Sequence, residues 1–272
     1  MMAGRMFALS STGEVLAGLA RAAHIEVTAY TLRGDVLYAL EAAARRGARV
    51  EVELESRPYN DPHGHLAAEN RSIVERLRNA GAEARLADPV HAKEIAVDGT
   101  LYFDDKNWGL GDLVLRAGDP ADCRSVAATK DGALDEEARL LRDARGSDGV
   151  VVASESFGCC NAVHSALEAL AREGLTPRLI VSERDLRRND RERSVLDGLV
   201  REGVRVRVCK DSEKLAVVGD RAWIGSANAT VAYGRANLPD WGLCSRDPRI
   251  VAAVRARIEA EWTLAKPFKA GR

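Results

Sequence analysis

Two short runs of the sequence carry side chains that could bind and attack a phosphate group. In the first, His91 and Lys93 stand two residues apart in a predicted strand, so their side chains point to the same face. In the second, Ser212 and Lys214 have the same spacing. An imidazole can attack phosphorus, and an ammonium group offsets the charge of the non-bridging oxygens. The pattern predicts chemistry on a phosphodiester.

Hydrogen-bond donors follow both lysines at one distance. Asn107 and Asn228 each lie 14 residues after the lysine of their run (107 − 93 and 228 − 214), and Ser226 shortly precedes the second asparagine. Carboxamide and hydroxyl groups can donate to phosphate oxygens. Because this set of side chains is rich in donors and poor in metal ligands, we expect neither a metal nor a cofactor.

The elements that position these side chains form an internal repeat. Residues 24–56 and 148–183 both read as an apolar strand, a polar turn, an amphipathic helix, a glycine and a second strand. The helix cores are nearly identical, ALEAAARRG at 39–47 and ALEALAREG at 166–174. The similarity continues through a further helix and strand (72–88 and 194–211) and a hairpin (91–108 and 212–229).

The repeat predicts an α/β protein of two pseudo-symmetric halves, residues 1–127 and 128–272, each a mixed β-sheet flanked by helices. Two copies of a fold usually pack about a pseudo-two-fold axis, so we expect equivalent positions to meet in one cleft. The tandem arrangement means that no oligomer is required to form the site. The final predicted helix, RIVAAVRARIEAEW, should cover a sheet edge or a sheet face.

Composition excludes several classes of protein. The chain has 272 residues, 46% hydrophobic and 30% charged, with a formal charge of −1, so neither a disordered chain nor a globally basic coat for nucleic acid is expected. No apolar run approaches the roughly 18–20 residues of a membrane span, and no signal-peptide core is present, so we expect a cytoplasmic protein. The cysteines lack metal-site spacing and are expected to be reduced thiols: Cys123, Cys159, Cys160, Cys209 and Cys244.

The H-x-K-x4-D run at 91–98 and the G-S-x-N run at 225–228 resemble the signature of the phospholipase D superfamily, the HKD phosphodiesterases. The resemblance implies a metal-independent enzyme in which His91 is the nucleophile and forms a covalent phosphohistidine. It also implies that acidic residues after each asparagine orient the imidazoles. Asp112 and Asp240 occupy comparable places, and Asp112 is our choice for His91. The remaining residues that the resemblance places at the site bind the phosphate or line it: Lys93, Lys214, Asn107, Asn228, Ser212 and Ser226.

The sequence departs from that signature in both halves. Ser212 stands where the second histidine, the general acid, is expected, and Gly219 stands at the aspartate position. In the first half, Asp104-Asp105-Lys106-Asn107 replaces G-S-x-N, and Asp105 is expected to repel a phosphate unless it is neutralised.

Three explanations of the missing histidine stay open. The acid could be another residue, with His24 and His164 as candidates. The substrate could carry a leaving group that needs no acid. Alternatively, the site could be retired, leaving a phosphate-binding or interaction module.

The substrate class rests on weaker signals. Arginine-rich loops favour a nucleic acid or a soluble phosphodiester, with a phospholipid hydrolase or phosphatidyltransferase as the alternative. The charge run at 183–193 predicts a solvated loop and helix start, or a basic rim that guides a polyanion.

Overall fold

Two compact units make up the chain. The computed structural model describes residues 7–59, 61–117, 126–146, 148–187, 189–231 and 238–271. Unit 1 comprises Met1–Val126 with Leu238–Asp240, and unit 2 comprises Ala127–Asn237 with Trp241–Arg272. Each unit holds a mixed seven-stranded sheet with helices, so the predicted α/β fold is confirmed. Cys123 lies outside the described residues.

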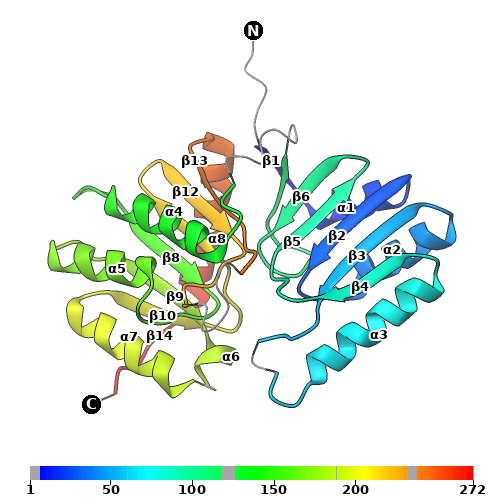
Figure 1. Ribbon diagram of the computed structural model, residues 1–272. Helices are drawn as coiled ribbons and strands as arrows, with labels where there is room; N and C mark the ends of the chain where they lie inside the picture. The colour runs from blue at the N-terminus through cyan, green and yellow to red at the C-terminus, as the bar shows by residue number, and fades with distance from the viewer. Residues whose placement is uncertain are drawn as a thin grey trace, which may run out of the picture. The chain divides into compact units, whose positions relative to one another are not determined.

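In unit 1, the three strands at one side of the sheet are parallel and the other neighbours pair antiparallel. The sheet order is β1-β7-β6-β5-β2-β3-β4, and β2, β3 and β4 run parallel (Figure 1). The sequence HIEVTA alternates in burial, with Ile25, Val27 and Ala29 in the core, as expected of a strand with one covered face. The elements are β1 (Phe7–Ser10), α1 (Thr12–Leu19), β2 (His24–Ala29), α2 (Gly34–Arg45), β3 (Arg49–Glu55), α3 (His65–Asn79), β4 (Glu83–Ala87), β5 (Lys93–Val97), β6 (Thr100–Asp104) and β7 (Val114–Ala117).

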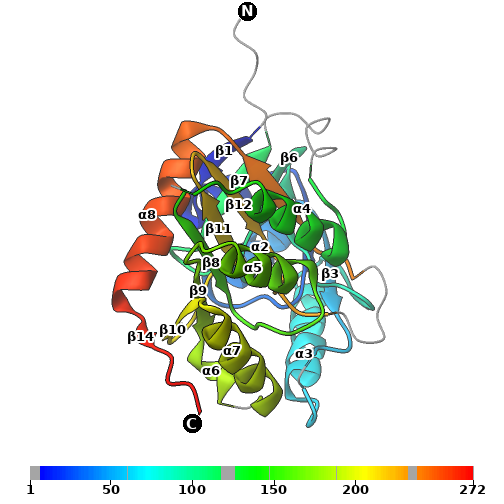
Figure 2. The same cartoon turned by 90° about the vertical axis from the view of Figure 1, so that its left-hand side faces the viewer.

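Unit 2 repeats this order, β13-β12-β11-β8-β9-β10, and adds β14 at one edge (Figure 2). Its last helix, α8, contacts β8, β10, β11 and β12, and helices α4, α5 and α7 pack into a separate core. All five residues of β8 are therefore buried. The elements are α4 (Lys130–Arg142), β8 (Val150–Ser154), α5 (Ala162–Arg172), β9 (Arg178–Ser182), α6 (Glu183–Leu186), α7 (Asp190–Glu202), β10 (Arg205–Cys209), β11 (Leu215–Val218), β12 (Arg221–Gly225), β13 (Gly242–Ser245), α8 (Pro248–Leu264) and β14 (Lys266–Pro267).

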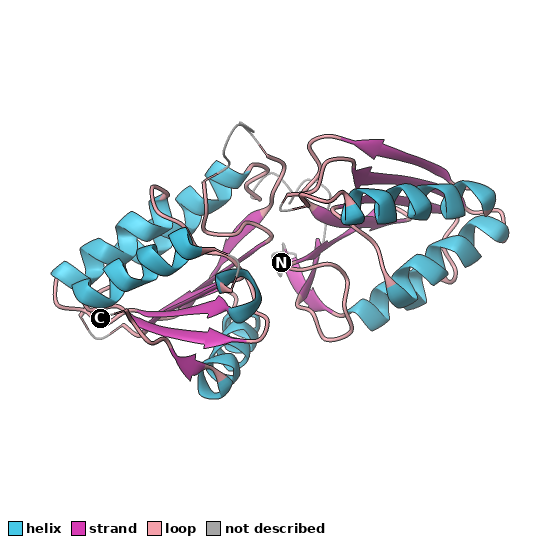
Figure 3. Cartoon of the chain, turned by 90° about the horizontal axis from the view of Figure 1, so that it is seen from below, coloured by secondary structure: helices cyan, strands magenta, loops and turns pink. Residues whose placement is uncertain are grey.

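The helices of unit 1 share one apolar core. Residues of α1, α2 and α3 join the inward residues of β2, β3 and β5 in a single buried cluster, and Figure 3 shows these helices beside their sheet. Among the described residues, no helix combines the length and apolar character needed to cross a bilayer.

The strand register makes two acidic residues equivalent. Asp104 pairs with Val114 between β6 and β7, and Gly225 pairs with Gly242 between β12 and β13. Counting back two residues from Val114 and from Gly242 gives Asp112 and Asp240. The structure thus places these aspartates at matching positions of the two repeats.

The turn after β5 fixes the role of the aspartate in the H-x-K-x4-D run. Asp98 and Gly99 both have positive φ, 47° and 83°, as a two-residue hairpin turn requires. The Asp98 carboxylate accepts the N–H groups of Ala23 and His24 at 3.0 and 2.9 Å. This aspartate therefore ties the hairpin to the start of β2, at the end of the sheet away from Lys93.

Candidate active site

The chain segment that carries His91 is held by a carboxylate at the end of strand β3. Glu55, the last residue of β3, is fully buried, and its carboxylate accepts the N–H of Val90 at 2.8 Å and that of Arg57 at 2.6 Å. A buried carboxylate that accepts two backbone N–H groups holds the approach to β5 in one conformation. His91 follows Val90 directly and stands two residues before Lys93, the first residue of β5.

The imidazole of His91 is oriented by Asp240. Nδ1 lies 2.6 Å from Oδ1 of Asp240, whose side chain is fully buried, and the His91 side chain is 12% exposed. A contact this short fits a charge-assisted hydrogen bond in which Nδ1–H donates to the carboxylate. In that tautomer the lone pair of the imidazole lies on Nε2.

The orienting carboxylate comes from the second repeat, although we expected Asp112. Leu238–Asp240 belongs to unit 1, while its neighbour Trp241 belongs to unit 2. The Asp112 carboxylate instead accepts the N–H of Gly109 at 2.5 Å. The carboxylate that the structure places within hydrogen-bond distance of Nδ1 is that of Asp240.

Lys93 lies beside the imidazole. Its Nζ donates to the His91 carbonyl at 2.6 Å and lies 3.3 Å from Nδ1, and the side chain is buried. The Tyr30 ring packs edge-on to His91 at 5.1 Å between centroids, and Nζ lies 5.7 Å from the Tyr30 centroid. Tyr30 donates to the carbonyl of Tyr59 at 3.2 Å.

Sequence reasoning missed Tyr30. Ala29 pairs with Lys93 across β2 and β5, so Tyr30, one residue past the end of β2, reaches the start of β5. An aromatic residue directly after the strand that pairs with the lysine is the signal that could have found it. The ring gives His91 an apolar wall and faces the ammonium group of Lys93.

The second run of residues is built differently. Ser212, at the position of His91, is fully buried, and Lys214 is 2% exposed. The Lys214 Nζ donates to Glu155 Oε2 at 3.1 Å, and Arg184 pairs with Oε1 of the same carboxylate. Unit 2 thus has a buried serine in place of the histidine, and its lysine, two residues later, is ion-paired.

In unit 2 the serine and the asparagine of the G-S-x-N run form hydrogen bonds to the backbone. Ser226 is fully buried; its Oγ accepts the N–H of Trp241 at 3.0 Å and its own N–H donates to the Trp241 carbonyl at 2.9 Å. This double link fixes the residue that follows Asp240. The Asn228 Oδ1 accepts the N–H of Ser156 at 3.3 Å, and Asn107 in unit 1 is exposed.

Comparison with solved structures gives the fold of the chain. No protein-family model and no curated protein sequence matches the chain. A polyphosphate kinase from Porphyromonas gingivalis matches 97% of this chain with a TM-score of 0.62 at 16% identity. A phosphatidylserine synthase from Haemophilus influenzae Rd KW20 matches 99% of this chain and 89% of its own, with a TM-score of 0.64 at 10% identity. The chain has the phospholipase D fold. It spans about half of the polyphosphate kinase chain, 48%.

The two aspartates that stand in place of the glycine and serine of G-S-x-N in the first repeat accept hydrogen bonds from the backbone. Asp105 Oδ1 accepts the N–H of Leu113 at 3.1 Å, the bond that Ser226 makes to Trp241 at the equivalent position. Asp104 accepts the N–H groups of Lys106 and Trp108 at 3.1 and 2.6 Å. Both aspartates are fully buried, and both carboxylates accept backbone N–H groups of their own repeat. The repulsion of a phosphate that we expected from Asp105 is therefore reduced by its hydrogen bond to Leu113.

The paired glycines of β12 and β13 explain the glycine of the second-repeat motif. A Cβ on Gly225 would lie 2.5 Å from the Trp223 ring and 2.6 Å from the Trp241 carbonyl oxygen. The strand can approach Trp241 this closely only without a side chain there.

One candidate for the missing proton donor is excluded by the register. His24 begins β2, and the β2 residue that pairs with Lys93 is Ala29 at the other end, about 16 Å along the strand. His24 instead lies near Glu26 and Glu51 at 3.4 and 3.5 Å. His164 lies in the first turn of α5, 3.8 Å from Glu168.

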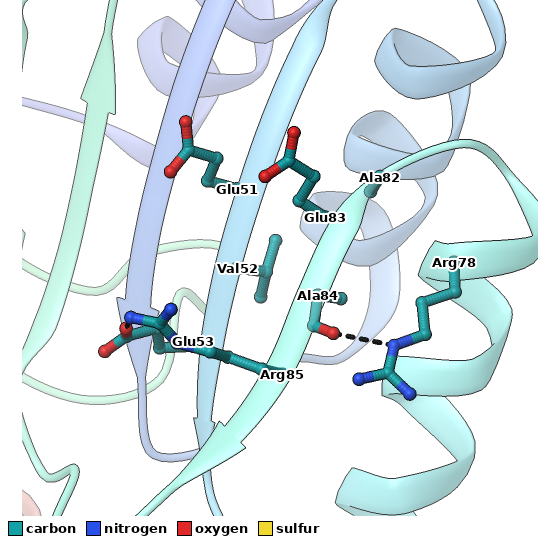
Figure 4. A pocket seen from close by; sticks show the side chains of 8 residues that line it. All are labelled: Glu51, Val52, Glu53, Arg78, Ala82, Glu83, Ala84 and Arg85. Carbon is teal, nitrogen blue, oxygen red and sulfur yellow. Dashed lines mark hydrogen bonds and ion pairs between the residues drawn. The ribbon is translucent and has the colours of Figure 1, made fainter.

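Two cavities are lined by residues other than those of the H-x-K and S-x-K runs. One of about 250 Å³ opens between β3, β4 and α3, and its charged lining residues are three glutamates and two arginines (Figure 4): Glu51, Glu53, Glu83, Arg78 and Arg85. The other, about 770 Å³, lies in unit 2 beside β10, β14 and the end of α8.

His63 and His65 lie with ring centroids 5.9 Å apart, and the described residues include no group of three or more metal-ligating side chains.

Burial, and to a smaller extent the nearby Asp112 carboxylate, raise the pKa of Asp104 to about 7 against the opposing effect of backbone N–H groups and Lys93. The folded protein therefore holds a proton on Asp104 that the unfolded chain releases above pH 4. The contribution of Asp104 to the free energy of unfolding is therefore fully present below about pH 4 and is lost as the pH rises from there to 7.

Asp104→Asn should remove that loss, because an amide oxygen can still accept both N–H groups. We expect its unfolding free energy, relative to wild type, to rise by about 2 kcal/mol between pH 5 and pH 8. Denaturant titrations at the two pH values measure it. Asp98→Asn, an exposed aspartate that also accepts two backbone N–H groups, is the matched control and should show no such change. Equal differences at both pH values would contradict a raised pKa at Asp104.

Proposed function

We propose that the protein is a metal-independent phosphodiesterase that acts through a covalent phosphohistidine on His91. The observation that supports it most is the Asp240–His91 contact of 2.6 Å with Lys93 at 3.3 Å from the same imidazole. An imidazole held in one tautomer beside a buried ammonium group is suited to attack an anionic phosphate.

The reaction has two displacements at phosphorus. In the first, the Nε2 lone pair attacks phosphorus, a P–N bond forms, and the P–O bond to the leaving group breaks with its electron pair. In the second, water attacks phosphorus, the P–N bond breaks, and the lone pair returns to Nε2 while the water proton is released. Lys93 balances the charge on the non-bridging oxygens in both steps, and Asp240 keeps the proton on Nδ1.

The substrate we propose is a nucleic acid or another soluble phosphodiester. Four exposed arginines of the 183–193 segment support a polyanion, and two of them, Arg184 and Arg187, also pair with Glu155 and Glu183: Arg184, Arg187, Arg191 and Arg193. One of the matching structures is a phosphatidylserine synthase, and a phospholipid headgroup is the alternative class.

The buried serine at position 212 supports a substrate whose leaving group departs without a strong acid. We expect wild type to hydrolyse bis(p-nitrophenyl) phosphate in EDTA, and to hydrolyse p-nitrophenyl esters far faster than diesters whose leaving group is an alkoxide. The difference beyond solution reactivity should be about 10²–10⁴-fold, the usual contribution of a general acid.

Initial rates with a series of leaving groups measure this dependence. A steep fall of rate with rising leaving-group pKa is the expected result. A flat series would mean that an efficient acid acts in the site, and EDTA-sensitive turnover would contradict metal-independent chemistry.

A further inference from the structure

The lysine of unit 2 faces a carboxylate where the lysine of unit 1 faces an aromatic ring. Tyr30 follows the last residue of β2, and Glu155 follows the last residue of β8, so the two residues match in the repeat. Lys93 Nζ lies 5.7 Å from the centroid of the neutral Tyr30 ring. Lys214 Nζ lies 3.1 Å from Glu155 Oε2.

A second cation completes the contact in unit 2. Arg184, in the short helix α6, pairs with Glu155 Oε1, so both carboxylate oxygens contact a cation. Ser182 fixes this arrangement, because its N–H donates to the Glu155 carbonyl at 3.2 Å and its Oγ accepts the Arg184 N–H at 3.2 Å. Glu155 is 20% exposed and Lys214 only 2%, so solvent screens the pair weakly.

Two cations that converge on two oxygens of one anion are what a phosphate group needs. We propose that Glu155 is an internal anion that occupies Lys214 and Arg184, and that it sets how weakly unit 2 binds phosphate. The inference rests on the proposed function only in taking phosphate as the anion. A carboxylate that bridges two cations is an ion-pair partner and a poor proton donor, so Glu155 does not replace the missing histidine.

Glu155→Gln tests the proposal, because it keeps the shape and removes the charge. With inorganic phosphate as the probe, calorimetry should give a Kd about tenfold lower than that of wild type. Adding Lys214→Met to this variant should abolish the gain. Glu168→Gln is the matched control, since Glu168 is 28% exposed and pairs with Arg172 on α5, and its Kd should stay within twofold of wild type. An unchanged or higher Kd in Glu155→Gln would overturn the proposal.

A second variant keeps the test decisive if Glu155→Gln does not fold, as loss of one partner of a buried pair can cause. Glu155→Asp keeps the negative charge but shortens the side chain, so the carboxylate no longer reaches both Lys214 and Arg184. This variant should lower the phosphate Kd severalfold, and an unchanged or higher Kd would overturn the proposal. Neither readout needs turnover, so an inactive protein whose Glu155→Gln variant gains phosphate affinity would refute the proposed function alone.

Discussion

His91→Ala should reduce the hydrolysis of bis(p-nitrophenyl) phosphate by about 10³-fold or more, because it removes the atom that forms the P–N bond. Since p-nitrophenolate departs without a protein acid, the loss reports the nucleophile alone. Steady-state release of p-nitrophenolate in EDTA measures it.

His24→Ala is the control for this variant, because His24 lies at the opposite end of β2 and should leave the rate within twofold of wild type. Thermal melts of both variants establish that they are folded. If His91→Ala retained a tenth of wild-type turnover, the nucleophile would have to be another group.

Asp240→Asn should reduce kcat by about 10²–10³-fold while KM changes little. The amide no longer favours the Nδ1–H tautomer, so the lone pair lies on Nε2 less often and kcat falls. Because Asp240 contacts the imidazole and not the substrate in this account, KM should change little. Full kinetics on p-nitrophenyl diesters separate kcat from KM.

Asp112→Asn is the matched control, since the register makes Asp112 the equivalent of Asp240 in the other repeat. We expect its kcat within a few-fold of wild type. The reverse order, with Asp112→Asn inactive and Asp240→Asn active, would restore our sequence-based choice and contradict the contact in the structure.

Most of the fold could be predicted because each helix, strand and turn of the repeat is specified by residues that are close together in the sequence. The alternation of HIEVTA, the amphipathic ALEAAARRG helix and the Asp98-Gly99 turn each specify an element from neighbouring residues alone. Copies of these patterns in the second half then fix the same strand order in both sheets.

The orienting acid could not be chosen from the sequence. Asp112 and Asp240 stand at equivalent registers, so their spacing from the asparagines is no guide. What separates them is that Leu238–Asp240 packs with unit 1 although it follows most of unit 2 in the chain. That is a tertiary contact across 149 residues, and no local pattern encodes it.

Pattern matching also overstated the likeness of the two lysines. Lys93 and Lys214 share a spacing, yet the residue after the neighbouring strand is Tyr30 in one repeat and Glu155 in the other. Asp105 is the opposite case: its sequence departs from serine, but its hydrogen bond to Leu113 reproduces that of Ser226 to Trp241. Residue identity at one position does not reveal which contact the fold requires there.

The most direct test of the proposed function is to trap the covalent intermediate. Wild type mixed with bis(p-nitrophenyl) phosphate and quenched within one turnover at alkaline pH, where a P–N bond persists, should yield a p-nitrophenyl phosphoryl group on the peptide that contains His91. The matching His91→Ala sample should carry none. Turnover with no adduct on His91, or with the adduct on another residue, would contradict phosphohistidine chemistry at this site.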